Sequence, residues 1–452
     1  MPLVSEELMN VINDTEYSRK RKALMEQIKK TTAFATADPS QMNNYLIPNF
    51  REDGGNFNRK PKQYRAIVRR VLQEYLNGVT GLPITRTSNI EVDLDSVTTN
   101  LDVRLIQTRM EIEGTIAVRP IWEDGEVFYQ IVSASDLIPW IDDRTGKLLA
   151  LAINCESAKN KIVEIWTDES IDIIIDGKQQ NTIENPYSTI PFVIYRASIH
   201  PTSFWGISDL HTIVENNNTI NKMLTDLQQL ATDQSFGIYV YMGPLPGEED
   251  RVSGEPSVRN EPLKIGTGRM IALPEGGKME ILSPNALIKE LNETIDNLTR
   301  GTFEDAMVFT LEKNSEYSTG FSISVKKGPY LRYMASKRIM FAKKDQRLVE
   351  LSVLAKDVAE RGPSTINPDF KVKTVIDATS LTPESAQEET LKSQFLMGAG
   401  VINKVDLLVE DKGMSREEAI EFLRQKEEEN VLLLKQEKHK LGPVDQKENA
   451  NG

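Results

Sequence analysis

The centre of the chain contains two stretches in which apolar side chains recur every three or four residues. In the first stretch they are Ile207, Leu210, Ile213, Val214, Ile220, Met223, Leu224, Leu227 and Leu230. In the second they are Leu287, Leu291, Ile295 and Leu298, and Ser283 and Pro284 precede them, as suits a helix cap and first turn. Such spacing is typical of helices with one apolar face. The sequence therefore predicts two amphipathic helices, over residues 207–235 and 283–306.

The segment between these helices, residues 236–282, interrupts the helical pattern. It contains Gly-Pro-Leu-Pro-Gly at 243–247 and further prolines at 256, 262 and 274. Short β-like runs such as 270–273 alternate with these turn residues. We expect a small, turn-rich insertion of α/β or β type, bracketed by the two helices.

The part of the chain before the first central helix predicts helices followed by an antiparallel sheet. Residues 1–80 are expected to be helical, with apolar spacing that stops at Gly78. Residues 81–206 are expected to be α+β, because strands over 115–122 and 126–132 flank Asp124-Gly125, whose residues tolerate the positive φ of a hairpin turn. Further strands are expected over 148–153, 162–167, 171–175 and 191–195. The basic run 19–22 forms a solvated helix face or contacts an acidic partner.

The part after the second central helix alternates polar loops with helices. A polar loop is expected over 307–321. Residues 322–381 are expected to hold a long helix to about 361, kinked at Gly328-Pro329, and a strand. This helix is basic, with ten Lys/Arg against four Asp/Glu between 325 and 361. Helices are expected over 382–440 and a disordered tail over 441–452. The predicted fold class is α+β and predominantly helical.

Composition and charge narrow the kind of protein. A chain of 452 residues with 39% apolar and 27% charged residues is expected to form several packed units. No apolar run approaches the roughly 20 residues that cross a bilayer, so we expect no membrane contact. The lone Cys155 fits a reducing compartment such as the cytoplasm. The net charge of −13 argues against a protein that binds DNA tightly by neutralising its phosphates with basic groups.

Catalytic and cofactor signatures were sought and not found. The chain has no phosphate-binding loop of the G-x-x-x-x-G-K-[S/T] type. Gly266-Thr267-Gly268 lacks the third glycine of a dinucleotide fingerprint and is interpreted as a turn. Three histidines and one cysteine cannot form a zinc cluster of usual spacing, and His211 is interpreted as a packing or surface residue. We therefore expect no enzyme activity, no cofactor and no metal.

Several short motifs, in their order along the chain, resemble those of one viral family. They are Ile190-Pro191-Phe192-Val193, then Phe204-Trp205-Gly206-Ile207-Ser208-Asp209-Leu210, then Ile220-Asn221-Lys222-Met223-Leu224-Thr225-Asp226, and later Ser318-Thr319-Gly320-Phe321. Together with Gly400-Val401-Ile402-Asn403 among the C-terminal helices, they resemble the tailed-bacteriophage portal proteins, the head-to-tail connectors of the SPP1-like portal family. The correspondence covers roughly residues 60–430, and the Gly328-Pro329 break belongs to none of its motifs.

The resemblance implies an architecture and a set of partners. It implies a dodecameric ring at one capsid vertex, assembled in the host cytoplasm and retained in the virion, whose channel passes double-stranded DNA during packaging and ejection. Residues 207–235 and 283–306 would be the stem, and 236–282 the α/β clip that meets the terminase motor and then the head-completion or adaptor proteins. Residues 1–80, 81–206 and 322–381 would form the wing, 307–321 the tunnel loop and 382–440 the helical crown. Major capsid and scaffolding proteins would be further partners.

The same resemblance directs attention to acidic residues of the stem and to the tunnel loop. Each predicted stem helix carries a net charge of −3, which would repeat around a bore and keep DNA off its wall. Alternatively, these acids solvate outer helix faces. Glu290, Glu293 and Asp296 are our candidates for the channel wall, and Asn314, Glu316 and Tyr317 for the tunnel loop.

Two further hypotheses remain open from the sequence. The basic helix could match an acidic surface of a neighbouring copy, in which case reversing Lys337, Arg338, Lys343 and Lys344 would abolish ring formation. The alternatives to a portal are another viral head–tail connector component and, from a different class, a metal-dependent nuclease that uses scattered acids.

Overall fold

The computed structural model describes most of the chain in two compact units. The described residues are 14–46, 62–142, 144–155, 162–176, 178–235, 238–242, 278–282, 288–308, 320–362, 370–377 and a few between 403 and 426. The first unit consists of residues 1–316 and 325–381, and the second of 317–324 and 382–452. None of the described helices combines the length and apolarity needed to span a membrane. The mixed α+β class with a majority of helix is confirmed.

Helices, most of which begin at an aspartate cap, build the N-terminal part of the first unit. The helices are α2 (Thr15–Thr36), α3 (Pro39–Met42), α5 (Ile67–Gly78), α6 (Leu94–Thr98) and α7 (Val103–Glu113). Asp14, Asp38, Asp93 and Asp102 each accept a hydrogen bond from a backbone N–H of the first turn that follows. The predicted end of α5 at Gly78 is confirmed, and a Cβ there would lie 2.6 Å from the Met334 sulfur.

Two antiparallel sheets follow. The first has the order β3-β2-β9, from β2 (Thr115–Glu123), β3 (Glu126–Ser133) and β9 (Val193–Arg196). Asp124 and Gly125 both have positive φ, 53° and 87°, so the predicted hairpin is confirmed. The second sheet runs β4 (Leu137–Ile141), β5 (Leu148–Asn154), β6 (Ile162–Thr167), β7 (Ser170–Ile175) and β8 (Lys178–Glu184) in sequence order. The strands predicted over 148–153, 162–167 and 171–175 are confirmed, whereas β4 and β8 were not predicted.

A small two-stranded sheet joins distant parts of the first unit. β1 (Ile84–Ser88) pairs antiparallel with β12 (Val372–Ile376), and the backbone N–H of Lys371 donates to the Asn89 side chain 282 residues away. The Arg86 guanidinium donates two hydrogen bonds, of 2.8 and 2.9 Å, to the buried carboxylate of Asp345. The strand pair is therefore anchored to the long helix that contains Asp345.

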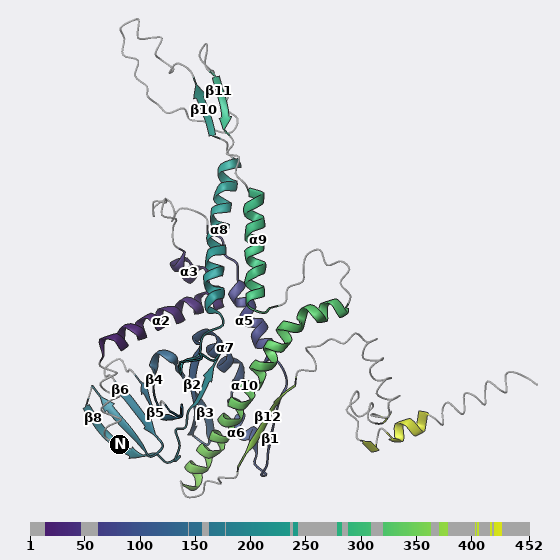
Figure 1. The fold of residues 1–452 in the computed structure, drawn as a ribbon. Helices are drawn as coiled ribbons and strands as arrows, with labels where there is room; N and C mark the ends of the chain where they lie inside the picture. Colours follow the sequence, from purple (N-terminus) through teal and green to yellow (C-terminus); the bar gives the residue numbers. More distant parts are fainter. Residues whose placement is uncertain are drawn as a thin grey trace, which may run out of the picture. The chain divides into compact units, whose positions relative to one another are not determined.

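The predicted sequence of helix, insertion and helix is confirmed. α8 (His211–Ser235) packs against α9 (Ile288–Asp305), as Figure 1 shows, and the strands β10 (Ile238–Met242) and β11 (Lys278–Leu282) pair between them in the sequence. α8 begins at His211 rather than at the predicted residue 207. The Ser208 hydroxyl accepts a hydrogen bond from the N–H of Leu210 and donates to the carbonyl of Glu111, which fixes the residues before the helix. The Ser283 cap, residues 270–273 and the proline-rich run at 243–247 lie outside the described residues.

The longest helix, α10 (Gly320–Arg361), continues through Pro329 without ending. Figure 1 shows it bending towards its N-terminal end, consistent with a proline in the helix interior. Its buried side chains, Met334, Phe341, Leu348 and Leu351, join a core that includes residues of α5, α7, β9, α8 and α9. The helix pair thus shares one apolar core with the long helix.

Candidate functional site

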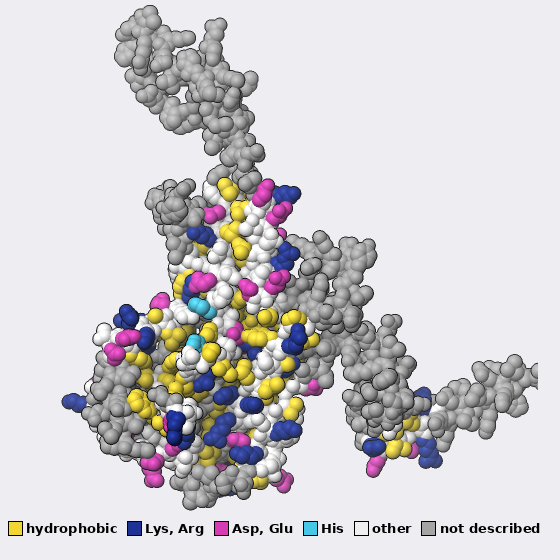
Figure 2. Space-filling model, in the orientation of Figure 1, with side chains coloured by type: hydrophobic (Ala, Val, Ile, Leu, Met, Phe, Trp, Pro, Cys, Tyr) yellow, Lys and Arg dark blue, Asp and Glu magenta, His cyan; other side chains and the backbone are white. Residues whose placement is uncertain are grey.

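The outer face of α9 carries the acids that the sequence singled out. Glu290, Glu293 and Asp296 are all exposed. By helical period Glu290 and Glu293 lie opposite Ile295 and Thr302, which are 1% exposed, whereas Asp296 lies at the side of the helix, near the position of the buried Phe303. Figure 2 shows acidic and basic side chains interleaved along the helix pair. Asp296 lies 3.8 Å from the Arg65 guanidinium and Glu293 lies 3.9 Å from the Lys289 ammonium, so these pairs are weak and solvated.

Two acids of the first predicted central helix form ion pairs within the subunit. Asp209 precedes α8, and its carboxylate lies 2.6 Å from the Lys337 ammonium. Glu215 lies on α8 and pairs with Lys30 at 2.5 Å. Two acids counted in the charge of the first predicted stem helix, Asp209 and Glu215, therefore pair with lysines of the same subunit.

A buried polar stripe on α8 holds the start of α5. Asn217, Asn221 and Thr225 are fully buried and follow one another at the i, i+4 spacing of a helix face. The Asn221 side-chain oxygen accepts from the N–H of Arg65 at 2.8 Å. The Asn217 oxygen accepts from the N–H of Val68 at 3.3 Å. α5 has no side-chain cap of its own, so α8 satisfies N–H groups that a helix start leaves unpaired.

This polar stripe explains one motif residue and adds a buried residue that the sequence did not single out. Asn221 is the asparagine in the middle of the helix on which the resemblance partly rests. Asn217, one turn earlier, is also 0% exposed. The recurrence of polar residues every four positions within the apolar face was the signal that could have placed it inside.

A buried group of charges connects α10 to the start of α8. The Lys337 ammonium lies 2.6 and 2.7 Å from the two oxygens of Glu111 and 2.6 Å from Asp209. The Tyr333 hydroxyl donates to Asp209 at 2.6 Å, and the rings of Tyr75 and Tyr333 flank the ammonium. Burial raises the pKa of Glu111 although Lys337 opposes the shift, and the two carboxylates outweigh burial to raise the pKa of Lys337.

This cluster removes Lys337 from the basic surface that the sequence predicted. Its side chain is 3% exposed, so it is a core residue. Arg338 donates to the carbonyl of Gly78 at 3.0 Å. Reversing all four cations of the earlier hypothesis would disrupt the subunit itself, because Lys337 has no solvent to compensate for its lost partners.

The remaining candidates are the predicted tunnel loop and the side chains that could support chemistry. Asn314, Glu316 and Tyr317 lie outside the described residues. His211 is exposed, with its Nδ1 2.9 Å from the Gln27 amide. Burial, followed by Glu164, raises the pKa of the half-buried Cys155 thiol to about 11. Within the described residues, no group of three His, Cys, Asp or Glu side chains could hold a metal ion.

Three solved structures resemble the chain at low sequence identity. The virion of a native gene transfer agent (GTA) particle gives a TM-score of 0.46 at 11% identity, over 76% of this chain and 88% of that chain. The neck of the native GTA particle, computed with C12 symmetry, gives 0.45 at 10% over the same shares. The neck of the empty particle, computed with C6 symmetry, gives 0.44 at 10%, over 80% and 94%.

Sequence comparison identifies the family. No curated protein matches the chain. The family model described as phage portal protein, SPP1 Gp6-like, matches residues 103–400. The matched region contains both sheets, the helix pair and the long helix with its buried lysine. Because this match spans well over half of its 452 residues, the chain belongs to the SPP1 Gp6-like family of phage portal proteins.

Proposed function

We propose that this portal-family chain assembles into a dodecameric ring at one capsid vertex, where its channel carries double-stranded DNA during packaging and ejection. In this proposal α8 and α9 form the stem, residues 236–282 dock the terminase motor and later the head-completion or adaptor proteins, and 382–440 form the crown. The ring assembles in the host cytoplasm with scaffolding and major capsid proteins and remains in the virion. Its role is structural rather than enzymatic, and it needs no cofactor.

The acidic outer face of α9 is the observation that carries this proposal. α9 buries Ile295 and Phe303 in the subunit and leaves Glu290, Glu293 and Asp296 exposed. Repeated around a ring, this face would form bands of negative charge. Such bands repel phosphates, so DNA can slide without being held. We place the channel wall on α9 because Asp209 and Glu215 lie 2.6 and 2.5 Å from lysines of their own subunit, whereas the cations near Glu293 and Asp296 are 3.9 and 3.8 Å away.

Imaging and mass of the purified full-length chain test the ring. Negative-stain micrographs should show rings with twelve-fold top views, and native mass spectrometry should give twelve times the subunit mass. A monomer that cleaves DNA when metal is added would favour the nuclease alternative and contradict the proposal. Rings that do not support DNA packaging would favour the alternative that the chain is another component of the viral head–tail connector.

Charge reversal on α9 tests the channel wall. The variant Glu290→Lys with Glu293→Lys should still form rings, yet the rings should bind linear duplex DNA. Each lysine–phosphate contact should add about 0.9 to the slope of log affinity against log salt. Packaging into capsids by the matching terminase should fall. The control Glu126→Lys with Glu184→Lys, on exposed strand positions, should change neither DNA binding nor packaging. If the α9 variant also leaves both unaltered, α9 does not form the channel wall.

The tunnel loop is tested separately. Deleting residues 312–318 should leave rings intact and reduce packaging, since the loop is proposed to contact DNA rather than neighbours. Loss of rings after this deletion would instead make the loop a structural element.

A further inference from the structure

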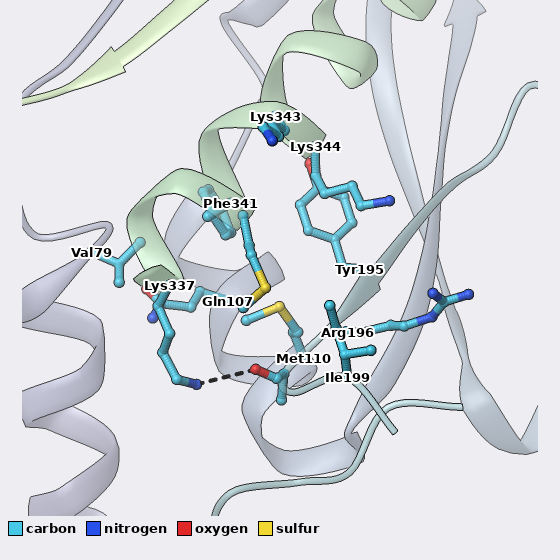
Figure 3. A pocket seen from close by; sticks show the side chains of 12 residues that line it. Val79, Gln107, Met110, Tyr195, Arg196, Ile199, Lys337, Phe341, Lys343 and Lys344 are labelled. Atoms are coloured by element: carbon cyan, nitrogen blue, oxygen red, sulfur yellow. Dashed lines mark hydrogen bonds between the residues drawn. The ribbon is translucent and has the colours of Figure 1, made fainter. Parts of the chain in front are cut away.

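A cavity between α10 and β9 has no role in the function proposed above. It has a volume of about 270 Å³ and is lined by side chains of α7, β9 and α10 and of the residues that directly follow α5 and β9. Met110, Phe341 and Val79 form part of its wall (Figure 3). Ile199 stands at this cavity with 68% of its surface exposed. An apolar cavity beside an exposed isoleucine on a subunit that must assemble is a candidate contact surface.

The rim of the cavity is cationic and, within the described residues, has no carboxylate partner. Arg196, Lys343 and Lys344 line it, and none of them forms an ion pair in the part of the chain that the structure describes. The Arg196 guanidinium lies over the Phe204 ring, 4.3 Å from its centroid. The Arg196 Nε is buried without a hydrogen-bond partner. Figure 3 shows the Arg196 and Lys344 side chains extending in the same direction from the two walls. Burial, then repulsion by Arg196, lowers the pKa of Lys344. Among the described residues of the subunit, no carboxylate therefore neutralises this rim.

The end of α9 has the complementary character. Glu304 and Asp305 are exposed in its last turn, which contains no basic residue. Carboxylates at a helix C-terminus add to the negative end of the helix dipole and are unfavourable unless a cation approaches. Met307 follows with φ of 54° and 47% exposure. Two acids and a protruding flexible apolar side chain thus form one knob, residues 304–307.

We propose that residues 304–307 of one copy dock at the Arg196–Lys343–Lys344 cavity of the neighbouring copy, with Met307 entering the apolar space and Glu304 and Asp305 facing the cations. Met307 does not line the cavity of its own subunit. A knob and a cavity built from different residues of one chain make a head-to-tail contact, and such contacts close into a ring when the rotation between copies closes. The inference rests on the proposed function, because it assigns the contact by which that ring would close.

Disulfide trapping in assembled rings tests the contact directly. In a Cys155→Ser background, Met307→Cys and Ile199→Cys are combined in one full-length chain. Mild oxidation should give a ladder of covalent oligomers on a non-reducing gel, reversed by reductant. Each single-cysteine chain should give no species beyond a dimer. Rings seen by negative stain whose chains still run as monomers after oxidation would overturn the docking and leave the proposed function standing. A wild-type chain that forms no rings would overturn both.

Charge exchange gives an independent readout. Lys343→Glu with Lys344→Glu should lower the fraction of chains in rings by about tenfold or more, because like charges then meet across the interface. Adding Glu304→Lys with Asp305→Lys to the same chain should restore rings. The matched control Lys178→Glu with Lys373→Glu, on exposed strand positions away from the cavity, should assemble normally. Undiminished rings in the Lys343/Lys344 variant would contradict the proposal.

Discussion

Replacing Lys337 by methionine tests the buried charge cluster at the base of α8. Methionine keeps the length and most of the volume of the side chain and removes only the ammonium. The Glu111 carboxylate, which is 0% exposed, and Asp209, whose side chain is 16% exposed, would then lose their shared cation. The subunit would contain two neighbouring buried carboxylates without a positive charge between them.

The structure sets the size of the effect. At an effective dielectric constant of about 20, opposite charges about 4 Å apart attract by about 4 kcal/mol, and here three N–O distances are 2.6 or 2.7 Å. Removing one partner of a buried ion pair costs about 3–5 kcal/mol. We therefore expect the free energy of unfolding to fall by about that amount. Adding Glu111→Gln should recover much of the loss, since it removes the most buried unpaired charge.

The pH dependence follows from the pKa of Glu111. Burial already raises this pKa, and the variant lacks the lysine that opposes the shift. The folded state then binds more protons than the unfolded state between the unfolded pKa of about 4.3 and the raised folded value. The variant should therefore become more stable as pH is lowered from 8 towards 5.5, more steeply than the wild type.

Urea unfolding of the full-length chain, followed by circular dichroism at several pH values, measures both effects. Arg332→Met, at an exposed position of the same helix, is the control and should change stability by less than about 0.5 kcal/mol. A Lys337→Met chain whose free energy of unfolding lies within about 1 kcal/mol of the wild type, with no added pH dependence, would refute the reasoning.

Two further predictions concern single side chains. Asn221→Ala leaves the N–H of Arg65 without its acceptor and should destabilise the chain by about 1–3 kcal/mol in thermal unfolding. Exposed Thr219→Ala serves as the control, and equal effects would argue against the cap. Cys155, with a pKa of about 11, should react slowly with iodoacetamide at neutral pH and faster as pH rises towards that value. Labelling at the rate of a free thiol at pH 7 would contradict this.

Local signals in the sequence predicted much of the fold. Asp124-Gly125 fixes a hairpin because both residues must adopt positive φ, and no distant partner is needed for that inference. The helix pair followed from apolar spacing alone. The exposure of Glu290 and Glu293 followed from the same period, because they lie opposite Ile295 on α9. The exposure of Asp296 did not, because Asp296 shares its side of the helix with the buried Phe303.

Features that depend on distant partners were not predicted. Lysine is usually a surface residue, so the sequence alone does not predict that Lys337 is buried. Its burial becomes favourable only because the fold places Glu111 of α7 and Asp209, which precedes α8, beside its ammonium group. The cavity likewise forms only where α10 meets β9. β1 and β12 contain no signal for each other, since their pairing is set by the packing of the elements between them.

The pairing of β1 with β12 has a consequence for how the chain matures on the ribosome. Val372 of β12 is buried with Val349 and Val353 of α10 and with Val97 and Val127 from the early part of the chain. A nascent chain therefore cannot complete this valine cluster until β12 emerges. Such late closure of a long loop slows folding and exposes an open strand edge to other nascent chains. Translation speed and chaperone supply should thus govern the yield of correctly folded subunits.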